Sequence, residues 1–192
     1  MNSRLQRWFW IELAKWSQRF NRSDTALKYY GFALALQADD PKILASIGFE
    51  LAGAGRKREA LASFDRVVEL KPDWAEVHFG RGFLLQELRD HEGALAAFDR
   101  TIEINPSHDR AYYGKGLSLI ALQRNDEAVP ALERNTKLQP MSPYGWYQLA
   151  RLQYNRGKPE KTRAIIDHLA TFEPKVAAQL ARETGFPAPP RP

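Results

Sequence analysis

The feature that most constrains the fold of this 192-residue chain is a repeat of 34 residues. The ten residues "FDRVVELKPD", which begin at Phe64, return as "FDRTIEINPS" from Phe98. Four series of residues keep this spacing: the prolines Pro72, Pro106, Pro140 and Pro174, the alanines Ala26, Ala60, Ala94 and Ala128, the glycines Gly48, Gly82 and Gly116, and the large apolar residues Tyr30, Phe64, Phe98, Leu132 and Ile166. Because the series share one register, the chain divides into five blocks, 7–40, 41–74, 75–108, 109–142 and 143–176.

Each block is expected to form two antiparallel helices. In the third block, "AEVHFGRGFLLQEL" and "EGALAAFDRTIEI" carry helical patterns, and the polar turn "RDHE" separates them. Pro106 prevents the second helix from continuing, so the repeated proline is a stop signal. Positions 8 and 20 of every block hold small residues, which allow the two helices to approach closely. The pairs are Ala14/Ala26, Gly48/Ala60, Gly82/Ala94, Gly116/Ala128 and Ala150/Thr162.

This pattern resembles the tetratricopeptide repeat, which has small residues at positions 8, 20 and 27, an aromatic residue at 24 and proline at 32. The third block supplies Gly82, Ala94, Phe98, Thr101 and Pro106. The resemblance covers residues 7–176 and implies an all-α fold, a right-handed superhelical solenoid of antiparallel helix pairs whose first helices line a concave face. We expect one domain over 1–184, a capping helix at about 175–184 with a left-handed stop at Gly185, and a flexible proline-rich tail over 185–192.

The departures from the repeat are few. Ala38 stands where the first block should have proline, and Thr162 replaces alanine in the fifth. Pro130 falls inside the second helix of the fourth block, where it removes the hydrogen bond to the Asp126 carbonyl. We therefore expect a kink at Pro130 or a late start of that helix.

Composition limits the function classes. The chain has no Cys, which excludes disulfides, thiolate metal sites and a cysteine nucleophile, and which fits a cytoplasmic location. No apolar run reaches the ~18 residues of a membrane span, and the first residues lack the features of a signal peptide. Residues 1–28 hold six basic and two acidic residues, so this end carries most of the formal charge of +5.

Positions 2, 5, 9 and 12 of the first helices should project into the concave face, and aromatic residues gather at them. With their polar companions, the candidate peptide-binding residues are Phe49, Phe79, Phe83, Gln86, Arg110, Tyr113, Tyr147, Arg151 and Tyr154. An aromatic trough with a few polar groups suits an extended or helical peptide. The alternative is that these rings serve mainly for packing. Phe49 and Phe83, at position 9, are the better candidates for ligand contact.

The first helix carries an unusual apolar strip. Its members share one helical face and are Leu5, Phe9, Leu13, Trp16 and Phe20. In later blocks, the positions of Phe9, Trp16 and Phe20 should pack against the preceding repeat, which the first block lacks. Three hypotheses stay open: the strip is covered by nearby side chains or remains partly exposed, two copies of the chain pair through it as a homodimer, or it docks on an anionic membrane or another protein.

The sequence argues against an enzyme, a metal site and a cofactor. The four histidines, His78, His91, His108 and His168, fall at different repeat positions, and each is expected to be solvated or close to a helix cap. The "GKG" at Gly114 lies within a helix and is no phosphate loop, and no serine lies in a nucleophile elbow. We expect no small-molecule substrate.

Two binding roles are also disfavoured. Nucleic acid fits poorly, because the excess charge lies at one end and no basic stripe follows the concave face. The clamp with which some family members bind the carboxylate end of chaperone tails is also missing, since position 5 holds Ile11 and Ala45 and position 6 never holds asparagine. The resemblance therefore implies a non-catalytic scaffold that binds a protein or peptide in its concave face.

Overall fold

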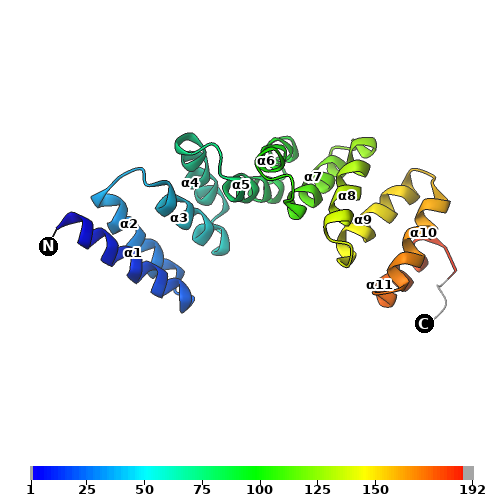
Figure 1. Ribbon diagram of the computed structural model, residues 1–192, viewed down its shortest axis with the longest axis horizontal. Helices are drawn as coiled ribbons and strands as arrows, with labels where there is room; N and C mark the ends of the chain where they lie inside the picture. The colour runs from blue at the N-terminus through cyan, green and yellow to red at the C-terminus, as the bar shows by residue number, and fades with distance from the viewer. Residues whose placement is uncertain (1, 188–192) are drawn as a thin grey trace. The chain divides into compact units, whose positions relative to one another are not determined.

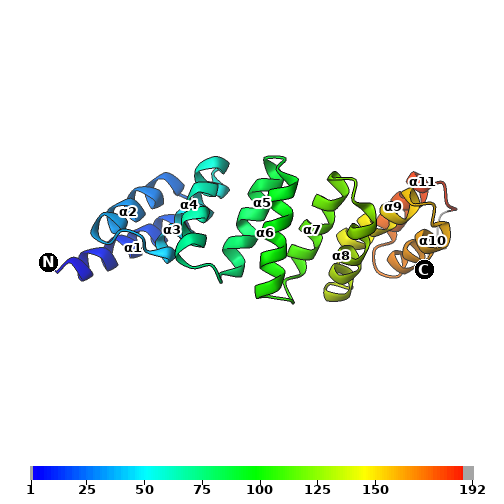
Figure 2. The same ribbon diagram turned by 90° about the horizontal axis from the view of Figure 1, so that it is seen from above.

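The computed structural model describes residues 2–187, which form eleven helices (Figures 1 and 2). They are α1 (Ser3–Arg19), α2 (Ser23–Leu36), α3 (Pro41–Gly53), α4 (Lys57–Leu70), α5 (Ala75–Glu87), α6 (His91–Ile104), α7 (Asp109–Ala121), α8 (Asn125–Leu138), α9 (Pro143–Asn155), α10 (Pro159–Ala170) and α11 (Pro174–Thr184). The chain separates into two compact units, Met1–Asn105 with α1 to α6 and Pro106–Pro192 with α7 to α11. Each unit is described below by itself.

Helices pack in consecutive pairs within both units. The first unit contains the pairs α1/α2, α3/α4 and α5/α6, and α2 and α4 each contact the first helix of the next pair. The second unit contains α7/α8 and α9/α10, with α11 packed against both α9 and α10. The prediction of an all-α fold built from helix pairs is confirmed. The prediction that residues 1–184 act as one domain stays a prediction.

The small residues of the repeat lie where two helices of a pair meet a large side chain. A Cβ atom added at Gly48 would come within 2.5 Å of the Phe64 ring, and one at Gly82 would come within 2.8 Å of the Phe98 ring. Both rings are almost fully buried. The glycines therefore make room for the core residue at position 24, which explains why the period retains them despite their cost in helix stability.

Polar side chains link the first three helices. Gln18 donates a hydrogen bond to Glu50 at 2.8 Å and accepts one from the Tyr30 hydroxyl at 2.9 Å. Burial raises the pKa of Tyr30, so this phenol remains a donor. Asp40 caps the N-terminus of α3 by accepting from the Lys42 amide and also pairs with Arg7. These contacts join α1, α2 and α3 with defined geometry.

Two positions outside the repeat pattern are Pro130, inside α8, and Gly185, at the end of α11. The helix α8 begins at Asn125, in register with α4 and α6, and continues through Pro130, so the expectation of a late start is wrong. Five residues precede Pro130 in the helix, and two of them, Ala128 and Val129, are buried. The kink stays a prediction.

The last helix, α11, stops at Gly185 with a φ of 73°, which confirms the left-handed stop. The proline-rich tail extends into 188–192, outside the described residues.

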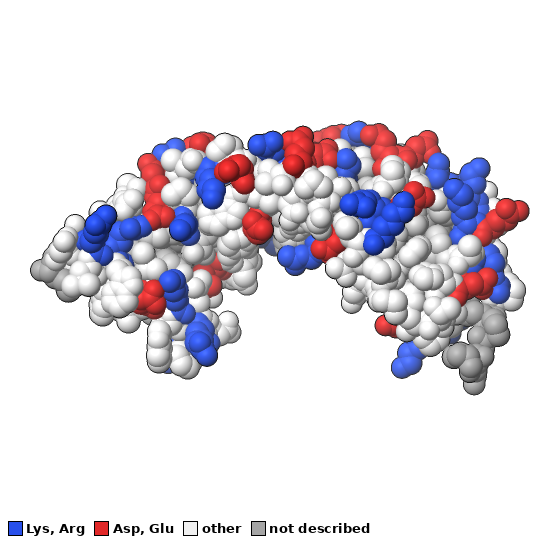
Figure 3. Space-filling view, viewed as in Figure 1, with Lys and Arg blue, Asp and Glu red and all other residues white. Residues whose placement is uncertain are grey.

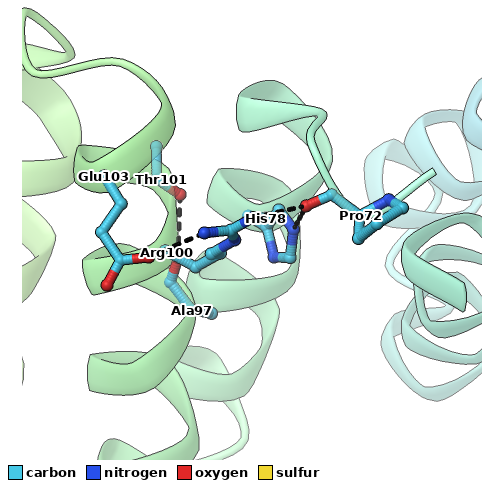
Figure 4. A network of polar contacts seen from close by, with 6 residues as sticks. All are labelled: Pro72, His78, Ala97, Arg100, Thr101 and Glu103. Atoms are coloured by element: carbon cyan, nitrogen blue, oxygen red, sulfur yellow. Dashed lines mark hydrogen bonds and ion pairs between the residues drawn. The ribbon is translucent and has the colours of Figure 1, made fainter.

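His78 is buried in the first turn of α5, so the alternative of a solvated ring is wrong for it, whereas its place beside the helix cap agrees with the other alternative. It is 6% exposed, and its Nε2 donates to the Pro72 carbonyl at 2.9 Å (Figure 4). Arg100, which pairs with Glu103 on α6, reaches the same carbonyl. The carbonyl of the repeated proline is therefore a fixed acceptor between α4 and α5. His108 does cap a helix, since its Nδ1 accepts from the Ala111 amide at the start of α7.

The burial of His78 predicts a pH dependence of stability. Burial lowers the pKa of this imidazole below its usual value near 6.5. Between the two pKa values the unfolded chain binds more protons than the folded chain, so the free energy of unfolding should fall as the pH drops below 6.5, by at most about 1.4 kcal/mol per pH unit. Urea unfolding at several pH values measures this. His78→Gln keeps a donor for the Pro72 carbonyl and should reduce the dependence of the free energy of unfolding on pH. An equal dependence in the wild type and the variant would show that His78 is not its source.

Candidate functional site

In the first unit, some of the aromatic residues predicted to bind a peptide pack against the core, and others are exposed. Phe49 on α3 lies with its ring centroid 4.9 Å from that of Phe64, yet it is 44% exposed. Phe79 on α5 packs on Phe98, with centroids 5.9 Å apart. Phe83 is 49% exposed. Phe79 is half-buried, whereas Phe83 and the outer part of Phe49 are accessible to a ligand. Gln86, one turn after Phe83, is half-buried.

The second unit contains a pocket of about 310 Å³ between α7, α9 and α11. Its lining residues are Tyr113, Pro143, Tyr144, Tyr147, Gln148, Val176 and Gln179. Two of them, Tyr113 and Tyr147, are among the predicted binding residues, and the structure brings them together. Tyr144 is 70% exposed and stands at the rim. We call this cavity the tyrosine pocket.

A second pocket of about 370 Å³ adjoins the tyrosine pocket, and more of its lining residues are polar or charged, although most of its exposed lining surface is apolar. It is lined by Asp109, Arg110, Tyr113, Asn135, Gln139, Ser142 and Tyr144. Tyr113 and Tyr144 belong to both walls, so the two cavities lie side by side. Asn135 is held in place because its amide donates to the Asp109 carbonyl at 2.9 Å. We call this cavity the polar pocket.

Hydrogen bonds fix the orientation of the tyrosine pocket. The Tyr147 hydroxyl donates to the Glu183 carboxylate at 2.6 Å, and Gln179 donates to the other oxygen of the same group at 2.8 Å. The bond to Glu183 raises the pKa of Tyr147, and in return the pKa of Glu183 is lowered. The guanidinium of Arg151 lies 5.7 Å from the Tyr147 ring centroid. Burial raises the pKa of Tyr113. Both phenols therefore stay neutral donors at neutral pH.

Some residues that line the tyrosine pocket were not predicted from the sequence as binding residues, among them Tyr144, Val176 and Gln179. Tyr144 occupies position 2 of its block, a position expected to face the concave side, so its signal was present. Val176 and Gln179 come from α11, which begins at the repeated Pro174 and continues beyond the fifth block, and no concave-face position of the repeat assigns them. Tyr154 was predicted to bind but lines neither pocket, although it is 43% exposed.

The apolar strip of α1 is exposed. The exposed fractions are 53% for Leu5, 43% for Phe9, 65% for Trp16 and 58% for Phe20. Leu5 does not cover the other three, so the strip has no cover among the described residues. Trp8, which is not a member of the strip, is also 59% exposed. Pairing of two copies and docking on a membrane or partner stay predictions.

The described residues form neither a metal-site cluster nor a membrane-spanning helix. Among residues 2–187, no three His, Asp or Glu side chains come together as a metal site would require. None of the described helices is long and apolar enough to cross a membrane. Acidic and basic side chains alternate over α4 and α6 (Figure 3), where they form pairs such as Arg56 with Glu59 and Arg66 with Glu69. The second-helix surface of this unit is thus a mixed, solvated face.

Helix pairs of 34 residues with an aromatic first-helix face define a class of helical repeat proteins that bind other proteins. The profile of the tetratricopeptide repeat matches residues 47–109, 82–134 and 113–170, and the chain belongs to this family. The family and its fold indicate a protein–protein interaction scaffold with protein or peptide partners. Proteins of this family are typically non-catalytic. No curated protein sequence matches the chain.

Solved structures share the fold at low identity. MamA from Desulfovibrio magneticus RS-1 is 20% identical, with 93% of this chain and 96% of that chain covered and a TM-score of 0.80. YrrB, described as a tetratricopeptide repeat protein with an unusual peptide-binding site, is 20% identical over 90% of each chain, with a TM-score of 0.80. A repeat protein from Parabacteroides merdae is 21% identical, with 94% and 74% covered and a TM-score of 0.83. These likenesses support the fold alone.

Proposed function

We propose that the protein is a non-catalytic scaffold that holds a peptide segment of a partner protein on the first-helix face of its second unit. The observation that carries this proposal is the pair of adjoining pockets that share Tyr113 and Tyr144. Ligand sites are concave, mostly apolar and equipped with a few oriented polar groups. Both pockets meet this description, and hydrogen bonds on α11 fix one wall.

The two pockets suit different side chains of one peptide. The tyrosine pocket is walled by aromatic rings, Pro143 and Val176, with Gln148 and Gln179 as polar groups, so it favours an apolar or aromatic side chain. The polar pocket offers the amides of Asn135 and Gln139 and the hydroxyl of Ser142, which favour a hydrogen-bonding side chain or the peptide backbone. A segment with an aromatic residue followed or preceded closely by a polar residue would fill both.

The first unit supplies a separate, weaker candidate surface. Phe83 and Phe49 are its most exposed aromatic side chains on α3 and α5. Both lie on helices whose glycines are used for packing, so the rings project from a rigid base. We propose that they contact further apolar side chains of the partner.

Peptide selection followed by titration tests the proposal. A random peptide library is selected on the full chain, and the enriched peptide is titrated into variants by calorimetry. Tyr144→Ala should weaken binding at least about tenfold, as a hot-spot aromatic does. Tyr112→Ala is the matched control, because this neighbouring ring lines a different cavity with Lys115 and Glu127. Equal affinity of wild type and the Tyr144 variant would move the site elsewhere.

A further inference from the structure

The free face of α1 combines large apolar side chains in a way that the other repeats do not. Trp16 and Phe20 stack on each other, with ring centroids 5.2 Å apart, yet both are more than half exposed. At the position of Phe9, Ile43 is 3% exposed and Val77 0%, and at that of Trp16, Leu84 is 2% exposed. These three are covered by a preceding repeat, whereas Leu88, at the position of Phe20, is 37% exposed. The sequence places larger apolar side chains where no described residue covers them.

Basic side chains lie along one edge of the exposed side of α1. At 100° per residue, Arg19 lies about 60° from Trp16, Lys15 about 100° and Arg4 about 120°, and the exposed Trp8 lies among these basic residues. Lys15 is paired with Glu12, whereas Arg4 and Arg19 are exposed and form no ion pair with the described residues. Arg22, just after the helix, is likewise exposed. Figure 3 shows blue and red surface beside white surface over α1. The exposed side of α1 therefore combines an apolar strip with a basic edge, on which Lys15 pairs with the one acidic residue, Glu12.

We propose that α1 docks the protein on an anionic lipid surface. Helices that lie in a membrane interface bury an apolar face rich in Trp, Phe and Leu while Lys and Arg contact anionic headgroups. Indole rings favour the headgroup level, which suits Trp8 and Trp16. Long arginine side chains at the edge of the strip can extend to the headgroups while their stems cover apolar surface.

The charge distribution favours a lipid surface over a second copy of the chain. Pairing two copies through this strip would bring their arginine-rich ends together, and like charges in an interface oppose association. An anionic surface instead attracts every one of these arginines. Docking also leaves the fold intact, because Ala14 and Ser17 on the inner face of α1 stay buried in the first unit. The pocket residues lie on other helices, so docking is independent of the proposed peptide binding.

Vesicle sedimentation of the full chain tests docking. Vesicles of phosphatidylcholine alone are compared with vesicles of phosphatidylcholine and phosphatidylglycerol. The protein should sediment with the anionic vesicles and be released by high salt. Trp16→Glu should weaken binding about tenfold or more, and Arg4→Gln with Arg19→Gln should weaken it about fivefold for each charge removed. Trp16→Leu keeps an apolar side chain and should retain most of the binding. Met141→Glu, at an exposed position of the second unit that lines neither pocket, is the control and should bind as the wild type does.

Three outcomes would overturn the proposal. The first is equal binding to both kinds of vesicle, and the second is unchanged binding by Trp16→Glu with a native circular dichroism spectrum. The third is a wild-type dimer in sedimentation equilibrium that Trp16→Glu converts to a monomer, without vesicle binding by either, which would assign the strip to self-association. Peptide titration of the α1 variants separates this result from the proposed function, since their peptide affinity should not change.

Discussion

Replacing Phe64 by alanine is expected to lower the free energy of unfolding of the first unit by about 3–5 kcal/mol. The ring is completely buried among Val67, Val77 and Leu84. It also fills the space beside Gly48 and Gly80, which lie on α3 and α5. The substitution would thus leave a cavity shared by two helix pairs. Because backbone glycines surround part of it, side chains cannot collapse into the space, and the cost should lie at the upper end of this range.

Phe49→Ala is the matched control for Phe64→Ala. The two rings touch, but Phe49 is 44% exposed and its removal opens no closed cavity. Its cost should be at most about 1–2 kcal/mol, near the centre of the distribution for single substitutions. Urea unfolding followed by circular dichroism measures both variants. Equal losses of stability would show that the position-24 aromatic is not the centre of the repeat core.

The second large effect is expected at Gly82. A Cβ atom there would lie 2.8 Å from Cε1 of Phe98, whose ring is 1% exposed and cannot move aside. Gly82→Leu should therefore lower the free energy of unfolding by about 1–3 kcal/mol or more through overpacking, although leucine is a better helix former than glycine.

Gly31→Leu separates packing from helix propensity. Gly31 also lies inside a helix, α2, but no atom lies within 4 Å of the position of an added Cβ. The same substitution should here raise the stability by up to about 1 kcal/mol. Opposite signs for the two variants in thermal or urea unfolding would support the close helix contact. Destabilisation of similar size at both positions would contradict it.

The fold could be predicted from the sequence because its packing is local and repeated. Pairs such as Gly48 with Phe64 return every 34 residues, and each pair reports one helix–helix contact, so the helix pairs and their register follow from spacing alone. The burial of His78 could not be predicted in this way. Its partner is the backbone carbonyl of Pro72, and a carbonyl has no residue-type signature.

The candidate site was predicted only in part. Tyr113 and Tyr147 follow from their repeat position, but the pocket is closed by Val176 and Gln179 on α11. Most of that helix lies beyond the fifth block, so its contribution depends on tertiary packing against α9. In the first unit, the repeat position alone could not separate the packing role of Phe79 from the exposure of Phe83.

The most direct test of the scaffold proposal is the position of a bound peptide. The peptide selected on the full chain is added to isotopically labelled protein, and chemical-shift changes are mapped by nuclear magnetic resonance. We predict the largest changes at Tyr113, Tyr144 and Gln148, together with the side chains of α11 that line the tyrosine pocket. Changes centred instead on the second-helix surface around Glu127 and Pro130 would contradict the account.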